Sequence, residues 1–144
     1  MRILGLDYGA HTVGVAVSDE TGKIATRLEI IRRKTESHER KTLARIEALC
    51  ETYGIEAIVL GLPLNMDGSE SERAAKTRAF MERLIRRTGL PVYLQDERLT
   101  SVEAEEIMKE TGIKPGDYKQ YVDMIAAEVI LQDYLNAREA AWKR

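Results

Sequence analysis

Cysteine and histidine are scarce in this sequence, and each scarcity excludes a class of site. Cys50 is the only cysteine, so no internal disulfide can form, and a small buried thiol in a reducing compartment is expected. The two histidines, His11 and His38, cannot supply a Cys/His set with the spacing of zinc ligands. A phosphate-binding loop of the form Gly-x-x-x-x-Gly-Lys-Ser/Thr is also missing.

Long apolar runs and an excess of one charge are missing as well. No segment has the roughly 20 apolar residues of a membrane span, and the apolar stretch before Asp7 is too short for a signal peptide. A cytoplasmic protein is therefore expected. The formal net charge is −2, whereas duplex-binding proteins are more often basic overall.

Basic residues do cluster locally in two places. The first cluster is Arg32-Arg33-Lys34 followed by Arg40-Lys41, and the second is Arg86-Arg87. A solvated surface is the default interpretation of both clusters, and a patch that binds nucleic acid is the alternative.

The residues that are present predict one α/β domain over residues 1–144. The chain has 44% hydrophobic and 32% charged residues, and at this length it would bury roughly 70% of its unfolded surface. The predicted order is βββ-α-β-α-β-α-α, with an antiparallel meander followed by parallel strands joined by helices in a mixed five-stranded sheet. Strands are predicted at 3–6, 13–17, 24–31, 57–60 and 91–95.

Repeated local signals mark the helix boundaries. Three helices are predicted to end at a glycine followed by an apolar residue, as in Gly54-Ile55, Gly89-Leu90 and Gly112-Ile113. Capping-box spacing predicts helix starts at Ser69 with Glu72 and at Thr100 with Glu103. The last helix is predicted to start near Asp117.

Acidic residues from three distant parts of the chain can share one edge of the predicted sheet. Asp7 ends the first strand, and Gly9 then lets the backbone turn and a charged ligand come close. Asp96-Glu97 follows the last strand, at the edge where open α/β sheets bind ligands. Asp123 lies one residue off the apolar stripe of the last helix, whose small Ala126-Ala127 pair allows a close approach to the sheet.

Carboxylates gathered at one place repel each other unless a cation joins them. Their hard oxygen atoms suit Mg²⁺ or Mn²⁺. Taken singly, each acid has an ordinary explanation: a turn former at Asp7, a solvated ion pair in Asp96-Glu97-Arg98, and an early-turn acid favoured by the helix dipole at Asp123. The three acids together favour a divalent-metal site.

Four segments, in order, resemble the YqgF (RuvX-like) family. They cover nearly the whole chain and comprise Asp7-Tyr8-Gly9 with 13–19, 61–68, 96–101, and 122–127 with 130–132. The resemblance implies a single ribonuclease H-like nuclease domain. Members of the family are described as nucleases that mature the 5′ end of precursor small-subunit ribosomal RNA, the function expected here, or as Holliday junction resolvases that act on branched DNA.

The resemblance also implies that Asp7, Glu97 and Asp123 are metal-binding catalytic acids. In a two-metal mechanism Asp7 would bridge two Mg²⁺ ions, and the other two acids would each complete one site. Among ribonuclease H relatives the second acid commonly lies on the fourth strand. Here it follows the fifth strand, so the longer Glu97 is preferred to Asp96. His11 stands where family members often carry a basic residue.

Further residues near these acids are candidates for substrate contact: Gly9, Arg98, Thr100, Ser101, Lys119 and Tyr121. Arg98 could orient Glu97 or touch the substrate backbone. Thr100 and Ser101 could donate to a phosphate at the helix N-terminus, with helix capping as the alternative. Tyr118 and Tyr121, beside Lys114 and Lys119, could stack on bases of a single strand, with partial burial of the rings as the alternative.

Three other functions stay open at this stage. A Holliday junction resolvase would use the same metal chemistry, and a symmetric junction would favour a homodimer. An ATPase of the actin-like and sugar-kinase superfamily also places Asp-x-Gly between two strands, but it needs two such domains and 144 residues supply one. A non-catalytic ribosome-assembly factor would bind structured RNA without cleaving it.

Overall fold

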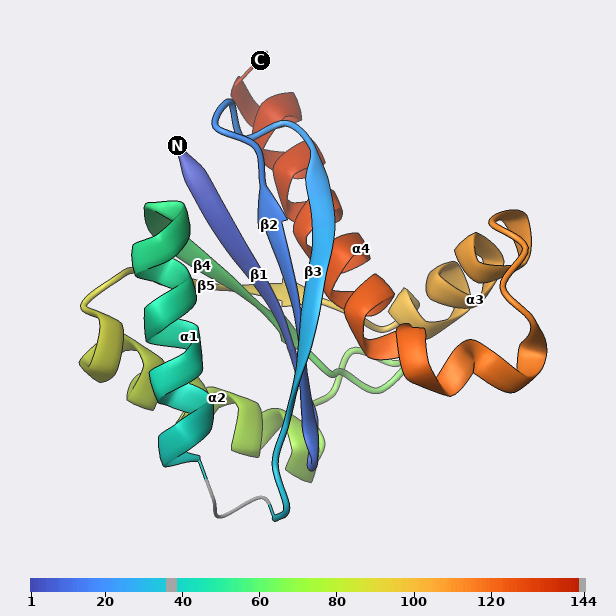
Figure 1. Cartoon of the computed structure of the whole chain (residues 1–144), viewed down its shortest axis with the longest axis horizontal. Helices are drawn as coiled ribbons and strands as arrows, with labels where there is room; N and C mark the ends of the chain where they lie inside the picture. Colours follow the sequence, from blue (N-terminus) through green and yellow to red (C-terminus); the bar gives the residue numbers. More distant parts are fainter. Residues whose placement is uncertain (36–38, 143–144) are drawn as a thin grey trace.

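Residues 1–35 and 39–142 are described by the computed structural model of the chain (Figure 1). The strands are β1 (Arg2–Tyr8), β2 (Thr12–Ser18), β3 (Ala25–Arg32), β4 (Ile55–Leu62) and β5 (Val92–Asp96). The helices are α1 (Arg40–Tyr53), α2 (Glu72–Thr88), α3 (Thr100–Glu110), the short 3₁₀ turn η1 (Pro115–Asp117) and α4 (Tyr118–Trp142). This is the predicted order of elements.

The five strands form one mixed sheet in the order β3-β2-β1-β4-β5. β1 pairs antiparallel with β2, and β2 pairs antiparallel with β3. β4 lies parallel to β1 and to β5. The predicted meander followed by parallel strands is therefore confirmed, and the carboxyl ends of β1, β4 and β5 meet at one edge of the sheet.

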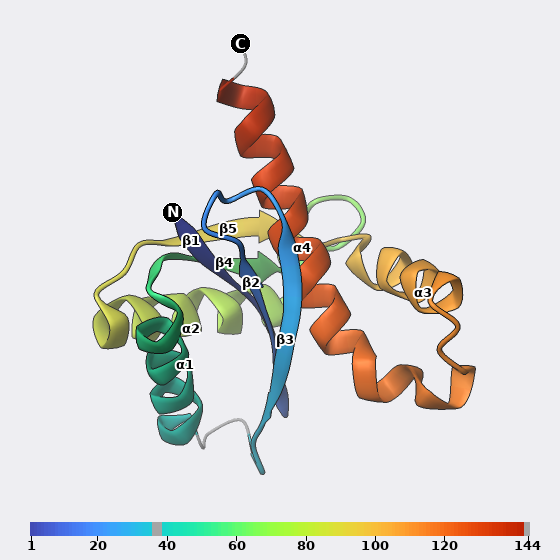
Figure 2. The same cartoon turned by 45° about the horizontal axis from the view of Figure 1, so that its top comes forward.

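Helices cover both faces of the sheet (Figures 1 and 2). On one face, alternate side chains of β1 such as Leu4 and Leu6 pack with Ile46 of α1 and Phe80 of α2. On the other face, Ile3 and its neighbours pack against α4 in a second apolar cluster. A third cluster joins α3 to the first half of α4. Among the described residues no helix is both long and apolar enough to cross a membrane.

Helix α4 lies almost directly on the backbone of the sheet, because two strand residues facing it are glycines. A Cβ atom at Gly14 would lie 1.9 Å from the carbonyl oxygen of Asp123, and one at Gly5 would lie 2.7 Å from Cβ of Leu131. The small Ala127, buried in the same contact, completes the close approach. This packing brings the first turns of α4 over the place where β1 and β2 pair.

The predicted helix ends are confirmed, whereas the predicted capping boxes are wrong. Gly54 and Gly89 are left-handed C-caps with φ of 63° and 70°, and Gly112, just after α3, has φ 79°. No side-chain hydrogen bond caps α2 or α3. Ser69 is occupied instead, since its hydroxyl donates to Asp67 at 2.6 Å. Thr100 is itself the first residue of α3 and is buried.

Gly14→Ala is expected to destabilise the protein by about 1–3 kcal/mol or more, because the added methyl group overlaps the backbone of α4. Urea denaturation followed by circular dichroism measures the change. Gly116→Ala is the matched control, since a Cβ atom there meets nothing within 4 Å and φ is not positive. Equal stability of the two variants would contradict the proposed role of Gly14.

Candidate active site

Asp7 lies near the carboxyl end of β1, on the side of the sheet that α4 covers. Side chains alternate along the strand, and Leu4, Leu6 and Tyr8 point to the opposite face. Asp7 opposes Gly14 in the β1–β2 register. It faces a cavity of about 260 Å³, which is lined by Asp7, Pro63, Leu64, Glu97, Arg98, Thr100 and Ala126.

Glu97 reaches Asp7 by crossing β4. Its backbone NH donates to the carbonyl of Leu62 at 3.2 Å, which continues the β4–β5 pairing by one residue. A Cβ atom at Gly61 would lie 2.7 Å from Oε2 of Glu97, so only glycine leaves room for this carboxyl group over β4. The side chain then hydrogen-bonds with Asp7 on the next strand.

The two carboxyl groups are crowded and desolvated, and the pKa of each is raised. For Asp7 the main cause is burial, followed by the negative charge of Asp123. For Glu97 the causes are burial, the charge of Asp7 and a hydrogen bond that the protonated form donates to Asp7. The guanidinium of Arg73 acts in the opposite direction on both groups. The pair therefore shares a proton near neutral pH.

Asp123 approaches the same edge from the first turns of α4. Its Oδ2 atom accepts a hydrogen bond from the Thr12 hydroxyl at 2.6 Å. Its charge helps to raise the pKa of Asp7, so the two carboxylates are electrostatically coupled. Within 1–35 and 39–142, no group of three or more His, Cys, Asp and Glu side chains is arranged to hold a metal ion. The structure thus joins Asp7 to Glu97 directly and leaves Asp123 beside them, held by Thr12.

The donor set nevertheless fits a hard divalent cation. All the donors are carboxylate oxygens, which Mg²⁺ and Mn²⁺ prefer. Burial and mutual repulsion hold the pKa values of Asp7 and Glu97 above their ordinary range. The positive charge of a cation bound between them would act against both effects.

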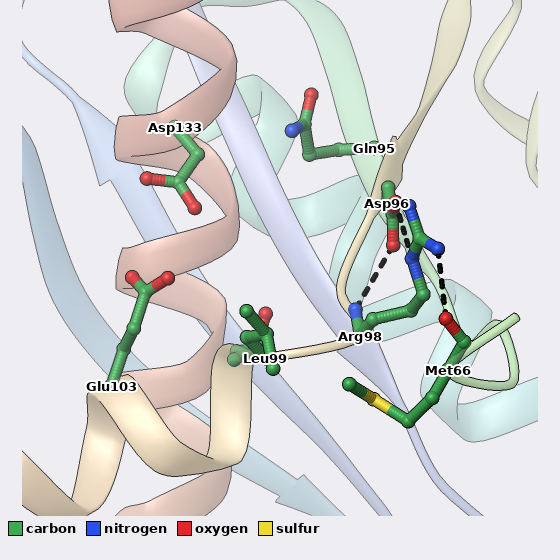
Figure 3. A pocket seen from close by; sticks show the side chains of 8 residues that line it. Met66, Gln95, Asp96, Arg98, Leu99, Glu103 and Asp133 are labelled. Carbon is green, nitrogen blue, oxygen red and sulfur yellow. Dashed lines mark hydrogen bonds and ion pairs between the residues drawn. The ribbon is translucent and has the colours of Figure 1, made fainter. Parts of the chain in front are cut away.

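Arg98 is held by Asp96 (Figure 3). Its hydrogen bonds go to Asp96 and Met66, so it does not orient Glu97. The two oxygens of Asp96 accept from the backbone NH and from Nε of Arg98 at 3.0 and 2.9 Å. Nη1 of Arg98 donates to the carbonyl oxygen of Met66 at 3.2 Å. The two bonds from Arg98 lower the pKa of Asp96, and the bond to Met66 ties two loops together beside the cavity. Glu97, and not Asp96, is the acid that meets Asp7.

The other predicted contact residues are dispersed. Gly9 forms the turn after β1, where its NH donates to the carbonyl of Thr12 at 2.8 Å. Thr100 lines the cavity. Lys119 and Tyr121 are exposed at the start of α4 and are not among the residues that line it. The side chain of Ser101 lies outside the described part of the chain.

Tyr118 and the histidines complete the predicted set. Tyr118 packs against the apolar cluster between α3 and α4, as expected of partial burial. His11 is exposed in the turn that contains Gly9, and His38 lies outside the described residues.

Three residues of the site are not among the site residues predicted from the sequence. Thr12 positions Asp123, and Gly61 makes room for Glu97. Arg73 reaches the acids from α2, and its guanidinium lies 4.8 Å from the ring centroid of Tyr8. A glycine ending an apolar strand could have indicated a close approach at Gly61. Thr12 and Arg73 depend on contacts that no local pattern reveals.

The fold is ribonuclease H-like. The structure of RuvC from T. thermophilus in complex with a Holliday junction substrate superimposes with a TM-score of 0.58 at 16% identity. The match covers 97% of this chain and 96% of that chain. At this identity the likeness shows the fold alone.

The chain belongs to the RuvX family, whose sequence profile, described as Holliday junction resolvase, matches residues 1–137. A relative from Agathobacter rectalis is 55% identical over 136 residues, covering 94% of this chain and 95% of the relative. A relative from Symbiobacterium thermophilum is 46% identical over 140 residues, covering 97% of this chain and 95% of the relative. Both carry the name "Putative pre-16S rRNA nuclease". The family predicted from the sequence is confirmed.

Asp7→Asn is expected to stabilise the protein by about 1–2 kcal/mol at pH 8 in EDTA. The native state holds a proton at the Asp7–Glu97 pair more tightly than the unfolded chain does. Ionisation therefore costs stability as the pH rises above the ordinary carboxyl pKa of about 4, and the gain should vanish towards pH 4. Urea denaturation of the wild type and the variant at pH 8 and at pH 4 measures this gain in the free energy of unfolding.

Asp96→Asn is the matched control for this measurement. The pKa of Asp96 is lowered by the bonds from Arg98, so its ionised form stabilises the native state. Removing that charge is expected to leave stability at pH 8 unchanged or lower. A gain for Asp96→Asn equal to that for Asp7→Asn would contradict the carboxyl pair.

Proposed function

We propose that this chain is a metal-dependent phosphodiester hydrolase that processes the 5′ end of precursor small-subunit ribosomal RNA. The observation that carries the proposal is the meeting of Glu97 and Asp7 across Gly61, with Asp123 coupled to them. The names of the relatives favour ribosomal RNA as the substrate. The active unit is a single ribonuclease H-like domain over residues 1–144, and such a substrate would place it in the cytoplasm.

Asp7, Glu97 and Asp123 would hold Mg²⁺ or Mn²⁺. When bound, such ions make a water molecule a better nucleophile and stabilise the leaving oxygen of a phosphodiester, most effectively as a pair. The chain itself positions the acids: Gly61 leaves the space over β4, and Thr12 orients one oxygen of Asp123. Binding a cation would release the proton that Asp7 and Glu97 share, because ligating carboxylates are ionised.

A Holliday junction resolvase is the second candidate, favoured by the description of the family and by the ribonuclease H-like fold shared with RuvC. The same acids would act on either backbone. A resolvase that cuts a symmetric junction would act as a homodimer, whereas cleavage at one end of an RNA requires only one copy of the protein. Cleavage assays on a precursor RNA fragment and on a four-way DNA junction, with sedimentation of the protein, separate the two candidates.

Asp7→Asn and Glu97→Gln are each expected to reduce Mg²⁺-dependent cleavage by more than about a hundredfold. Loss of an outer partner of a metal site costs about 10–100-fold, and loss of a ligand should cost more. Single-turnover cleavage of the RNA fragment in Mg²⁺ and in Mn²⁺ measures the rates. Asp96→Asn is the control and should retain activity, since Asp96 pairs with Arg98.

Full cleavage by folded Asp7→Asn would reject the assignment. RNA binding that survives both EDTA and Asp7→Asn, with no cleavage by the wild-type protein at any metal concentration, would instead favour a non-catalytic assembly factor.

Thr12→Val is expected to lower cleavage by about 10–100-fold, because Asp123 loses the hydroxyl that orients it. Thr12→Ser keeps a hydroxyl and should restore most of the rate. The metal concentration needed for half-maximal activity should rise in Thr12→Val and return in Thr12→Ser. Equal metal requirements in both variants would assign Thr12 a purely structural role.

A further inference from the structure

A further hollow lies at the same edge of the sheet, and its rim is basic. The groove has a volume of about 710 Å³ and lies between the end of β3 and the start of α1. Its lining residues are Ile31, Arg32, Arg33, Lys34, Glu39, Arg40, Lys41 and Thr42. In Figures 1 and 2 the end of β3 lies beside the carboxyl end of β1, the strand that carries Asp7, and α1 and α4 lie on opposite sides of the sheet.

Four cations of this rim make no ion pair with any residue in the described ranges: Arg32, Lys34, Arg40 and Lys41. All four are exposed. Nearby arginines behave differently, since Arg45 pairs with Glu29, Arg83 with Glu39 and Arg87 with Glu47. In a chain whose net charge is −2, four unpaired cations around one groove form a local site for anions.

Glu39 is the one acid among the described residues that line the groove, and its charge is already neutralised. Glu39 accepts two hydrogen bonds from Arg83, at 2.5 and 2.8 Å, and one from the Tyr8 hydroxyl at 2.6 Å. Burial acts to raise the pKa of Glu39, but these bonds outweigh it and the pKa is lowered. Its charge is therefore balanced within the protein and does not cancel the cations of the rim.

Arg33 connects the groove to the turn that follows Asp7. Its Nη2 donates to the carbonyl of Gly9 at 2.5 Å, and its Nε to that of Ala10 at 3.1 Å. Its guanidinium lies 4.7 Å from the ring centroid of Tyr8. Arg32 also opposes Thr12, the residue that holds Asp123, in the β2–β3 register. The groove lies on the face of the sheet that α1 covers and the acids lie on the face that α4 covers, and the turn after β1 joins the two.

We infer that this groove binds the phosphate backbone of a single-stranded segment of the substrate that continues from the acids around the turn after β1. The inference rests on the proposed nuclease function and extends it to the form of nucleic acid bound. Within the described part of the chain no aromatic side chain lines the groove, so recognition is of phosphates and independent of sequence. A hollow of this size with cations on both walls encloses one strand, whereas a duplex would need a wider basic surface than this chain offers.

Equilibrium binding of a labelled single-stranded oligoribonucleotide in EDTA, over a range of salt concentrations, tests this inference. The double variant Arg40→Ala/Lys41→Ala removes the two cations of one wall of the groove, and Arg32→Ala/Lys34→Ala removes the two cations of the other wall. If each cation meets one phosphate, each double variant should reduce the slope of log K against log salt by about 1.4. The affinity at 0.1 M salt should fall roughly 10–30-fold.

Arg86→Ala/Arg87→Ala is the matched control, because it removes two positive charges at the other end of α2 from Arg73. Its slope and affinity should stay close to those of the wild type. The inference is overturned if both groove variants match the wild type or this control, or if they weaken duplex binding as much as single-strand binding. Thermal melting of each variant verifies folding.

Binding in EDTA requires no cleavage, so this result is independent of the proposed function. Active Asp7→Asn with normal salt slopes in the groove variants would overturn both proposals. If Asp7→Asn is inactive and the groove variants bind RNA as the wild type does, only the inference about the groove is overturned.

Discussion

The contact between helix α4 and the bare backbone of the sheet is the constraint on which the site depends. Gly14 and Gly5 have no side chain where the helix passes, so its axis lies closer to the strands than any larger residue would allow. That closeness brings Asp123, from the far end of the sequence, over the β1–β2 pair that contains Asp7. Thr12 then needs only one hydrogen bond to hold the carboxylate at the edge.

The acids are kept together at an electrostatic cost. Two partly desolvated carboxyl groups meet at Asp7 and Glu97, and their raised pKa values measure how unfavourable the doubly ionised pair is. Arg73, beside the Tyr8 ring, offsets part of the repulsion. Local destabilisation of this kind is typical of functional sites, where a ligand of opposite charge relieves it. Cations that form no ion pair within the described ranges stand along the same edge, so charges of both signs face the solvent where a polyanion would lie.

Much of the architecture follows from local patterns. Apolar strand runs and helical spacing predicted the order of all the elements, and Gly54 and Gly89 ended their helices as left-handed caps because φ is positive there. Capping boxes failed for a local reason that spacing cannot show, since Ser69 bonds to Asp67 in its own loop. Arg98 could be read as a partner of either neighbouring acid, and only the fold of the loop joined it to Asp96.

The sequence by itself determined the alternation of strands and helices and the acids at the ends of strands, because periodicity and turn chemistry act over a few residues. The tertiary structure alone decided that Glu97 passes over Gly61 to Asp7 and that Thr12 holds Asp123. It also decided that Arg83 and Arg45 form ion pairs, whereas the cations around the groove form none with residues 1–35 and 39–142. Each of these depends on how distant segments dock, and docking is set by the packing of whole surfaces that no short pattern encodes.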